Sequence, residues 1–167
     1  HGKTWGIIGL GAIGRRVAEI ARAFGAKVIY YSASGAPAQE GYEQVDFETL
    51  LTQSDIISVH APLNEHTEGL INSKTFEKMK SSCIFLNLGR GPIVVEQDLY
   101  EALENDEIAA AGLDVLCQEP MSETNPLRKI KDSKKLLITP HVAWASVEAR
   151  TKLMGIILGQ IKEYFQI

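Results

Sequence analysis

The 167-residue chain has little cysteine, no excess of basic charge and no long apolar run. Only Cys83 and Cys117 occur, and they form no CxxC pair, which excludes a disulfide scaffold and a zinc or redox motif. Lysine and arginine number 17 against 21 aspartates and glutamates, which leaves no basic excess for a nucleic-acid backbone or an anionic membrane. No stretch approaches the roughly 20 uncharged apolar residues needed to cross a bilayer.

The remaining composition is that of an ordinary globular domain, with 45% hydrophobic and 23% charged residues. A length of 167 residues fits one domain, and no internal repeat or second domain boundary is visible. The unpaired cysteines and the lack of a signal peptide predict a reduced, cytoplasmic setting. Because the chain starts abruptly at His1 and not at methionine, we expect it to be a piece of a longer protein.

Short apolar runs alternate with segments of helical period along the whole chain. The run TWGIIGL at 4–10 is typical of a buried parallel strand. Two loops are expected, at 32–45 and 114–135. Strands alternating with helices predict one α/β domain, a doubly wound parallel sheet of the Rossmann type with six strands. The predicted strands cover 4–10, 27–31, 55–60, 83–88, 108–113 and 136–139, and the predicted helices cover 12–24, a short segment after Asp46, 72–79, 96–104 and 146–165.

Two of the predicted helices carry a regular apolar face. In the first, spacings of four, three and four residues align Ile13, Val17, Ile20 and Phe24 on one face. In the last helix the corresponding apolar residues are Leu153, Ile156, Ile157 and Ile161.

A glycine turn follows the first predicted strand. Gly9, Gly11 and Gly14 form G-x-G-x-x-G directly after a strand and at the start of a helix, which is the context that a dinucleotide-binding turn requires. The first glycine permits the tight turn, the second lets a pyrophosphate approach, and the third lets helix and strand pack closely. The free amides at the helix start favour an anion. A plain strand–helix turn explains three glycines at this spacing less well.

The acidic residue that usually follows the second strand and binds the ribose hydroxyls is missing. Ser32 occupies that position, 18 residues after Gly14, and no arginine or lysine follows before Gly41. Ser32 and Ser34 can hydrogen-bond to either cofactor, or simply shape the turn. The sequence therefore leaves NAD and NADP open, with a slight preference for NAD.

Three polar residues follow the last three predicted strands. Arg90 lies in NLGRG, Glu119 in GLDVLCQEP and His141 in TPHVAWAS. The carboxyl ends of parallel strands lie along one edge of a sheet, where ligands bind. Taken singly, Arg90 reads as a solvated turn residue, Glu119 as a loop carboxylate and His141 as a helix-capping residue. Together, beside a dinucleotide turn, they indicate a catalytic site.

The glycine turn, VHAPLNEHTEGLI at 59–71, LNLGRGPIV, GLDVLCQEP and TPHVAWAS resemble the cofactor-binding domain of the D-isomer-specific 2-hydroxyacid dehydrogenases, almost from end to end. HVAWAS looks most like the glycerate dehydrogenases, also called hydroxypyruvate reductases. The resemblance implies that Arg90 binds the substrate carboxylate and polarises the carbonyl, that His141 is the acid–base catalyst, and that Glu119 pairs with His141. Such chemistry needs a planar cation for the carboxylate and a histidine near neutral pKa for the proton.

The resemblance also implies which residues line the cofactor site. Asp114 is placed near the nicotinamide, unless it is only a turn residue, and the segment around His60 lines the adenine pocket without a catalytic role. Trp144 either walls the substrate pocket or anchors the last helix, and His66 is expected to be solvated. Two positions depart from the family: Cys117 replaces a common aromatic, and Ala12 replaces a frequent arginine or asparagine. The expected cofactor-binding residues are Gly9, Gly11, Ala12, Ile13, Gly14, Ser32, His60, Ala61, Pro62, Thr67, Leu88, Gly89, Arg90, Asp114 and His141.

These residues predict an oxidoreductase that acts on a small 2-keto or 2-hydroxy acid, with no metal. The substrate domain of such enzymes is absent from residues 1–167, so we expect this chain to bind dinucleotide but to turn over poorly or not at all. The resemblance also implies a homodimer. The alternative is a non-catalytic NAD(H)-sensing module, as in the transcriptional co-repressors related to this family. The sequence also leaves the substrate undecided, because another acid of the family, such as 3-phosphoglycerate or D-lactate, is an alternative.

Overall fold

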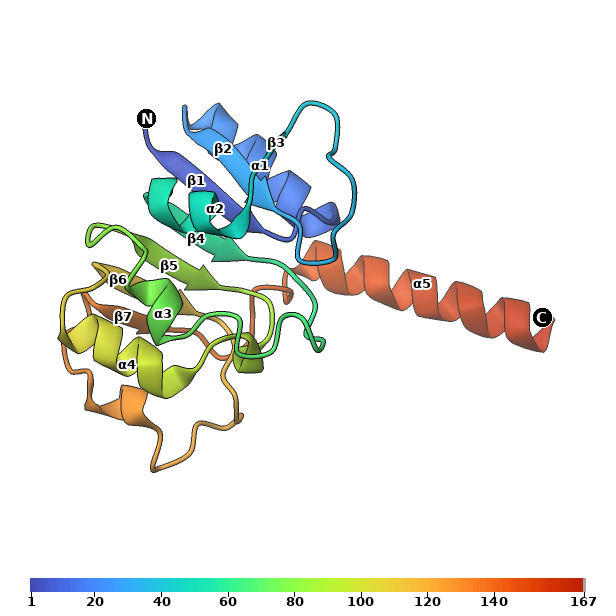
Figure 1. The fold of residues 1–167 in the computed structure, drawn as a ribbon. Helices are drawn as coiled ribbons and strands as arrows, with labels where there is room; N and C mark the ends of the chain where they lie inside the picture. Colours follow the sequence, from blue (N-terminus) through green and yellow to red (C-terminus); the bar gives the residue numbers. More distant parts are fainter. Residues whose placement is uncertain (167) are drawn as a thin grey trace.

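A seven-stranded parallel sheet forms the centre of the molecule (Figure 1). The computed structural model describes residues 1–166. The strand order is β3-β2-β1-β4-β5-β6-β7, so β1 has β2 on one side and β4 on the other. The strand order reverses at this point, and in open α/β sheets ligands bind at such a reversal, beyond the carboxyl ends of the strands.

The described elements follow the predicted alternation of strands and helices. The strands are β1 (Thr4–Ile8), β2 (Lys27–Tyr31), β3 (Glu43–Gln44), β4 (Ile56–Val59), β5 (Ile84–Asn87), β6 (Ala110–Leu113) and β7 (Leu136–Ile138). The helices are α1 (Ala12–Ala23), α2 (Phe47–Gln53), α3 (Ser73–Phe76), α4 (Glu96–Glu104) and α5 (Val147–Phe165), with 3₁₀ turns η1 (Gly91–Ile93) and η2 (Pro126–Lys129).

The predicted α/β class and parallel sheet are confirmed, and the six-strand count is wrong by one. The additional strand β3 has only two residues, and it lies at the edge of the sheet inside the expected loop 32–45. A two-residue strand has no periodicity to detect, so its backbone pairing with β2 reveals it. The expected loop 114–135 likewise contains η2, which Asn125 caps by accepting a hydrogen bond from the Leu127 amide.

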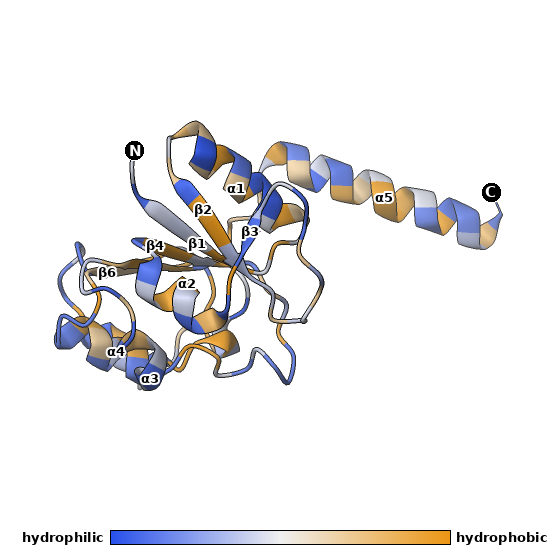
Figure 2. Ribbon diagram, turned by 45° about the horizontal axis from the view of Figure 1, so that its top comes forward, coloured by the Kyte–Doolittle hydropathy of each residue, from blue (hydrophilic) through white to orange (hydrophobic). Residues whose placement is uncertain are grey.

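Helices cover the two faces of the sheet unequally. Figure 2 shows α1 on one side and α2, α3 and α4 on the other. The larger apolar core lies under α2–α4 and includes Leu50, Phe76 and Leu99, all fully buried. The smaller core lies under α1 and includes Ile7 and Tyr30.

Helix α1 does not pack on the sheet through the apolar face that the sequence predicts. The buried residues of α1 are Gly14, Ala18 and Ala21. On the predicted face, Ile13 and Phe24 are 70% and 76% exposed. Small residues let the helix lie close to β1, because a Cβ at Gly14 would overlap the carbonyl oxygen of Gly9. Close approach of the backbones therefore decides this interface. Of the predicted face, only Val17 is partly buried against the core, whereas Ile13, Ile20 and Phe24 are exposed.

Helix α5 extends away from the sheet, as Figure 1 shows, and none of its residues is buried. The predicted apolar face is present, but Leu153, Ile156 and Ile161 are exposed. A helix with this much apolar surface is normally covered by another part of a protein. No described helix is both long enough and apolar enough to cross a membrane.

Candidate active site

The glycine turn brings the ends of β1 and β4 into contact. Gly9 has φ +93°, and a Cβ there would lie 2.7 Å from the amide nitrogen of Ala61, directly after β4. Gly14 packs against the Gly9 carbonyl. Gly11 has open space where a Cβ would be, and it caps α1 without any side-chain hydrogen bond. The first amides of α1 therefore face an open position that can receive a negatively charged group.

The described residues fit a dinucleotide. At Gly11 a Cβ would meet no atom within 4 Å, so the space in front of the first amides of α1 is open, and any side chain there would extend into it. A buried polar atom, Nδ1 of His60, has no hydrogen-bond partner among the described residues. The other ring nitrogen of His60 lies 3.1 Å from the Ser58 hydroxyl, which accepts from the Trp5 indole at 2.9 Å. Burial lowers the pKa of His60 to about 4, so the ring is neutral near pH 7.

Arg90 is presented by a short turn after β5. The side chain of Asn87, which is 1% exposed, accepts from the Gly89 amide and donates to the Arg90 carbonyl, at 3.1 and 3.0 Å. Gly91 then passes so close to Leu116 that a Cβ would overlap that backbone. The buried Asn87 thus fixes the turn from the protein interior, while Arg90 itself is exposed.

Asp114 fixes the segment that carries His141. Its buried carboxylate accepts from the Thr139 hydroxyl at 2.5 Å and from the amides of Val142 and Ala143 at 2.9 and 2.8 Å. Burial alone would raise the pKa of Asp114, but these hydrogen bonds outweigh it and hold the pKa below its ordinary value. The carboxylate is therefore ionised and ties β6 to the segment after β7.

His141 and Glu119 form a direct pair. Nδ1 of His141 lies 2.9 Å from one Glu119 oxygen, and the other oxygen accepts from the Leu116 amide at 2.9 Å. The Leu116 amide, followed by His141, holds the pKa of Glu119 below its usual value. An ionised carboxylate only accepts hydrogen bonds, so Nδ1 carries the hydrogen and Nε2 is left for a ligand. His141 has φ +54°, and its carbonyl accepts from the Trp144 indole at 2.9 Å.

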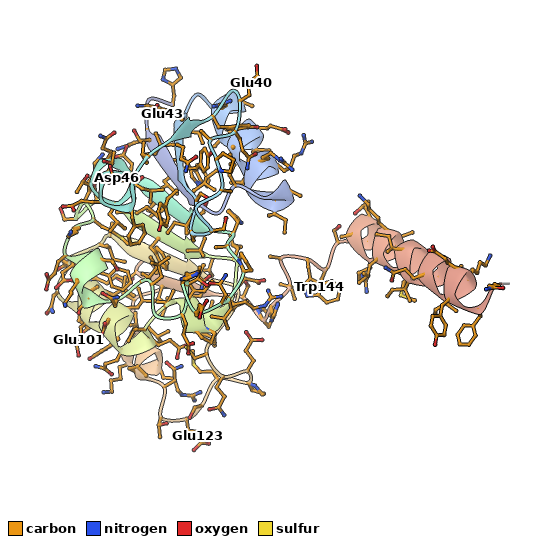
Figure 3. All side chains as sticks on the ribbon, turned by 45° about the vertical axis from the view of Figure 1, so that its right-hand side comes forward. Glu40, Glu43, Asp46, Glu101, Glu123 and Trp144 are labelled. Atoms are coloured by element: carbon orange, nitrogen blue, oxygen red, sulfur yellow. The ribbon has the colours of Figure 1, made fainter. Side chains whose placement is uncertain are left out.

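One cleft of about 450 Å³ brings these groups together. Arg90, Asp114 and His141 line it, together with His60, the residue directly after β4. Its apolar wall includes Ile13, Leu88 and Trp144. Figure 3 shows Trp144 on the segment between the sheet and α5. A second hollow of about 650 Å³ lies along His141 and Glu119, beside Met121. A cation and an imidazole therefore line the same cleft, beside the glycine turn.

The loop after β4 carries Thr67, which was expected to bind the cofactor, and His66, which was expected to be solvated. Thr67 is fully buried, and its hydroxyl donates to the Pro62 carbonyl at 2.7 Å, so it holds this loop in place. His66 is exposed and lies 3.6 Å from Glu65, as a solvated histidine would. Asn87 and Thr139 position the site although the sequence alone did not single them out. Their signal is weak, because a polar residue at a strand end has many ordinary roles.

Replacing Asp114 by alanine is expected to lower the free energy of unfolding by about 2–4 kcal/mol, because three donors lose their common acceptor. The pKa of this carboxyl is depressed in the folded state, so the stability that it contributes is present above about pH 4 and is lost as pH falls through the folded pKa. Urea unfolding at pH 7 and pH 3 measures both effects.

The matched control for Asp114 is Glu123→Ala, which removes one carboxylate from an outer loop (Figure 3). Glu123 is exposed, and we expect almost no change in the unfolding midpoint. Equal midpoints for the Asp114 and Glu123 variants would show that the network around Asp114 does not stabilise the fold.

Comparison with known proteins identifies the family. The family model "D-isomer specific 2-hydroxyacid dehydrogenase, NAD binding domain" matches residues 1–143. The chain therefore belongs to the D-isomer-specific 2-hydroxyacid dehydrogenases and forms their NAD-binding domain. It is 45% identical over 167 residues to a hydroxypyruvate reductase of Blautia hydrogenotrophica, covering 99% of this chain and 51% of the relative.

Two solved structures share the fold. D-lactate dehydrogenase with NAD⁺ from Lactobacillus jensenii is 39% identical with a TM-score of 0.85, covering 93% of this chain and 50% of that one. An acyclic imino acid reductase with NADPH and D-Arg is 40% identical with a TM-score of 0.88, covering 98% of this chain and 51% of that one. The chain thus spans about half the length of these relatives.

Proposed function

We propose that this chain is the cofactor-binding half of an enzyme that transfers a hydride between NAD(P)H and a small 2-keto or 2-hydroxy acid of the glycerate and hydroxypyruvate type. The observation that carries the proposal is the cleft in which Arg90 and the Glu119-paired His141 lie beside the glycine turn. The 45% identity to a hydroxypyruvate reductase supports the substrate class.

Arg90 binds the substrate carboxylate in this proposal. A 2-keto acid carries its carboxylate beside the reacting carbonyl, and a guanidinium can hold the first while it polarises the second. Within residues 1–166, only Nη1 of Arg90 is engaged, by the Gly89 carbonyl at 2.8 Å, so the outer edge of the guanidinium is left for the substrate.

His141 supplies the proton. When the carbonyl carbon gains a hydride, the carbonyl oxygen becomes an alkoxide and takes a proton from Nε2 of His141; oxidation of the alcohol returns the proton to the same atom. Glu119 holds Nδ1 at 2.9 Å and so keeps the ring oriented with Nε2 free for the substrate oxygen. Glu119 is a positioning residue, because it acts through His141.

The cofactor would be held by Gly9, Gly11 and Gly14 at its pyrophosphate and by His60, Leu88 and Asp114 towards the cleft, and it supplies the hydride when bound. The backbone at Ala12, Ile13 and Gly89 completes the cradle. Ala61 and Pro62 contribute through the loop after β4. Ser32 lies at the end of β2, where the adenosine ribose is expected.

The test is an assay of a polypeptide that completes this segment to the length of its relatives. Hydroxypyruvate and glyoxylate are offered while NADH or NADPH absorbance is followed, and we expect oxidation of the nucleotide with at least one of them. Pyruvate and 3-phosphohydroxypyruvate test the other acids of the family. Tight nucleotide binding without oxidation by any 2-keto acid would favour the alternative, an NAD(H)-sensing module like the co-repressor relatives.

The 167-residue chain alone is expected to bind dinucleotide and to turn over poorly or not at all, because a second domain must close the cleft and exclude water. Turnover equal to that of the completed polypeptide would contradict this. We also propose that the completed protein is a homodimer, a state to which the exposed apolar residues of α1 and α5 are suited. Sedimentation equilibrium measures it.

A further inference from the structure

A third and smaller hollow, of about 200 Å³, lies at the end of β2 beside the glycine turn. Its lining includes Gly11, Tyr30, Ser32, Ser34 and Gln39, and no carboxylate contributes to it. The two serine hydroxyls lie 3.3 Å apart. The carboxylate that follows Gln39 in sequence, Glu40, is exposed and points outward in Figure 3. Nothing in the lining therefore repels a negatively charged group.

An arginine from α1 is hydrogen-bonded to Gln39, one of the residues that line this hollow. Nη1 of Arg15 donates to the side-chain oxygen of Gln39 at 3.2 Å, and the Gln39 amide donates to the Leu10 carbonyl at 2.9 Å. Gln39 is further fixed through its backbone, which donates to the Tyr30 hydroxyl at 2.9 Å. Arg15 therefore does not line the hollow itself, but its guanidinium is bonded to Gln39, which does, and approaches from the helix side.

Arg15 differs from the other arginines of α1. Arg16 is paired with Glu19 at 2.7 Å, and Arg22 lies over the Tyr42 ring and donates to the Gly41 carbonyl. Arg15 is exposed, and within residues 1–166 it forms no ion pair. A guanidinium that is not paired with a carboxylate can bind a phosphate through two parallel hydrogen bonds.

NADP differs from NAD by one phosphate on the adenosine ribose. A site for NAD usually has a carboxylate there, and a site for NADP usually has an arginine. We propose that Arg15, with Ser32 and Ser34, binds this 2′-phosphate, so that the chain takes NADPH at least as tightly as NADH. The inference rests on the proposed function. No arginine or lysine follows β2 before Gly41, and in this proposal the cation for the phosphate comes from α1 instead.

The experiment is a calorimetric titration of the 167-residue chain with NADPH, NADH, adenosine 2′,5′-bisphosphate and 5′-AMP. The last two differ only at the 2′-phosphate. In Arg15→Ala, we expect NADPH and the bisphosphate to bind about 10- to 100-fold more weakly, as the loss of a charged hydrogen bond predicts, while NADH and 5′-AMP change less than about threefold. Arg16→Ala removes the same charge one residue later. It should leave the affinity for NADPH relative to NADH, and for the bisphosphate relative to 5′-AMP, as in the unmodified chain.

Three results would overturn the inference. One is tenfold tighter binding of NADH than of NADPH by the unmodified chain. Another is an equal loss for both nucleotides in Arg15→Ala, which would make the arginine a structural or pyrophosphate residue. The third is an equal effect of Arg16→Ala. If no nucleotide binds at all, the proposed function fails as well, so the two failures are distinguishable.

Discussion

Replacing His141 by alanine in the completed polypeptide is expected to lower kcat by about 10²- to 10⁴-fold, the usual contribution of a positioned acid–base group. Nε2 of His141 is the atom that remains for the substrate oxygen, because Glu119 holds Nδ1 at 2.9 Å. The affinity for NADH should stay nearly unchanged, since the cradle at Gly9–Gly14 comes from other elements. Steady-state kinetics and fluorescence titration of NADH measure the two quantities.

The control for His141 is His66→Ala, which removes a histidine from an exposed loop. We expect unchanged kcat and unchanged NADH affinity in that variant. A His141 variant that retained turnover within about threefold would remove this residue from the chemistry. Loss of nucleotide binding together with turnover would instead assign His141 a structural role, through its carbonyl and Trp144.

The second large effect is expected at the glycine turn, where two substitutions distinguish an effect on NADH binding from an effect on stability. Gly11→Ala should leave the unfolding midpoint almost unchanged, because a Cβ there meets no atom within 4 Å. It should weaken NADH binding by about 100-fold or more, because the methyl group occupies the place of the pyrophosphate. Gly14→Ala should lower stability by about 1–3 kcal/mol and weaken binding too, because its Cβ overlaps the Gly9 carbonyl.

The matched control is Gly155→Ala in α5, where a Cβ also meets nothing within 4 Å. This variant should bind NADH as the unmodified chain does. Its stability should be equal or slightly higher, since alanine is the better helix former. If Gly11→Ala binds NADH as well as Gly155→Ala does, the turn is only a strand–helix connection.

Much of the fold could be predicted because its signals are local. Continuous apolar runs indicated the buried strands, and Asp46 and Ser146 cap helices where the sequence placed helix starts. The packing of α1 could not be predicted from periodicity. Its large apolar residues, such as Ile13 and Phe24, form a regular stripe that faces outward, because glycine and alanine let the backbones approach.

The candidate site was predicted through residues that share one sheet edge, and Arg90 and His141 do line one cleft. The supporting contacts were not predictable, because they join distant segments. Asp114 binds residues 139–143, and Arg15 reaches Gln39 across a loop without regular structure. The sequence has no arginine or lysine between β2 and Gly41, and only the folded chain brings Arg15 of α1 to Gln39 in that loop.

The most direct test of the central claim is an amide NMR titration of the 167-residue chain with NADH or NADPH. We expect the largest shift changes along one edge of the sheet, at Gly9–Gly14, at Leu88–Arg90 and at Val142–Trp144, with little change in α2 and α4 on the opposite side. Changes confined to α2 and α4, or changes at the glycine turn that leave Arg90 and the His141 segment unaffected, would contradict a shared cofactor and catalytic cleft.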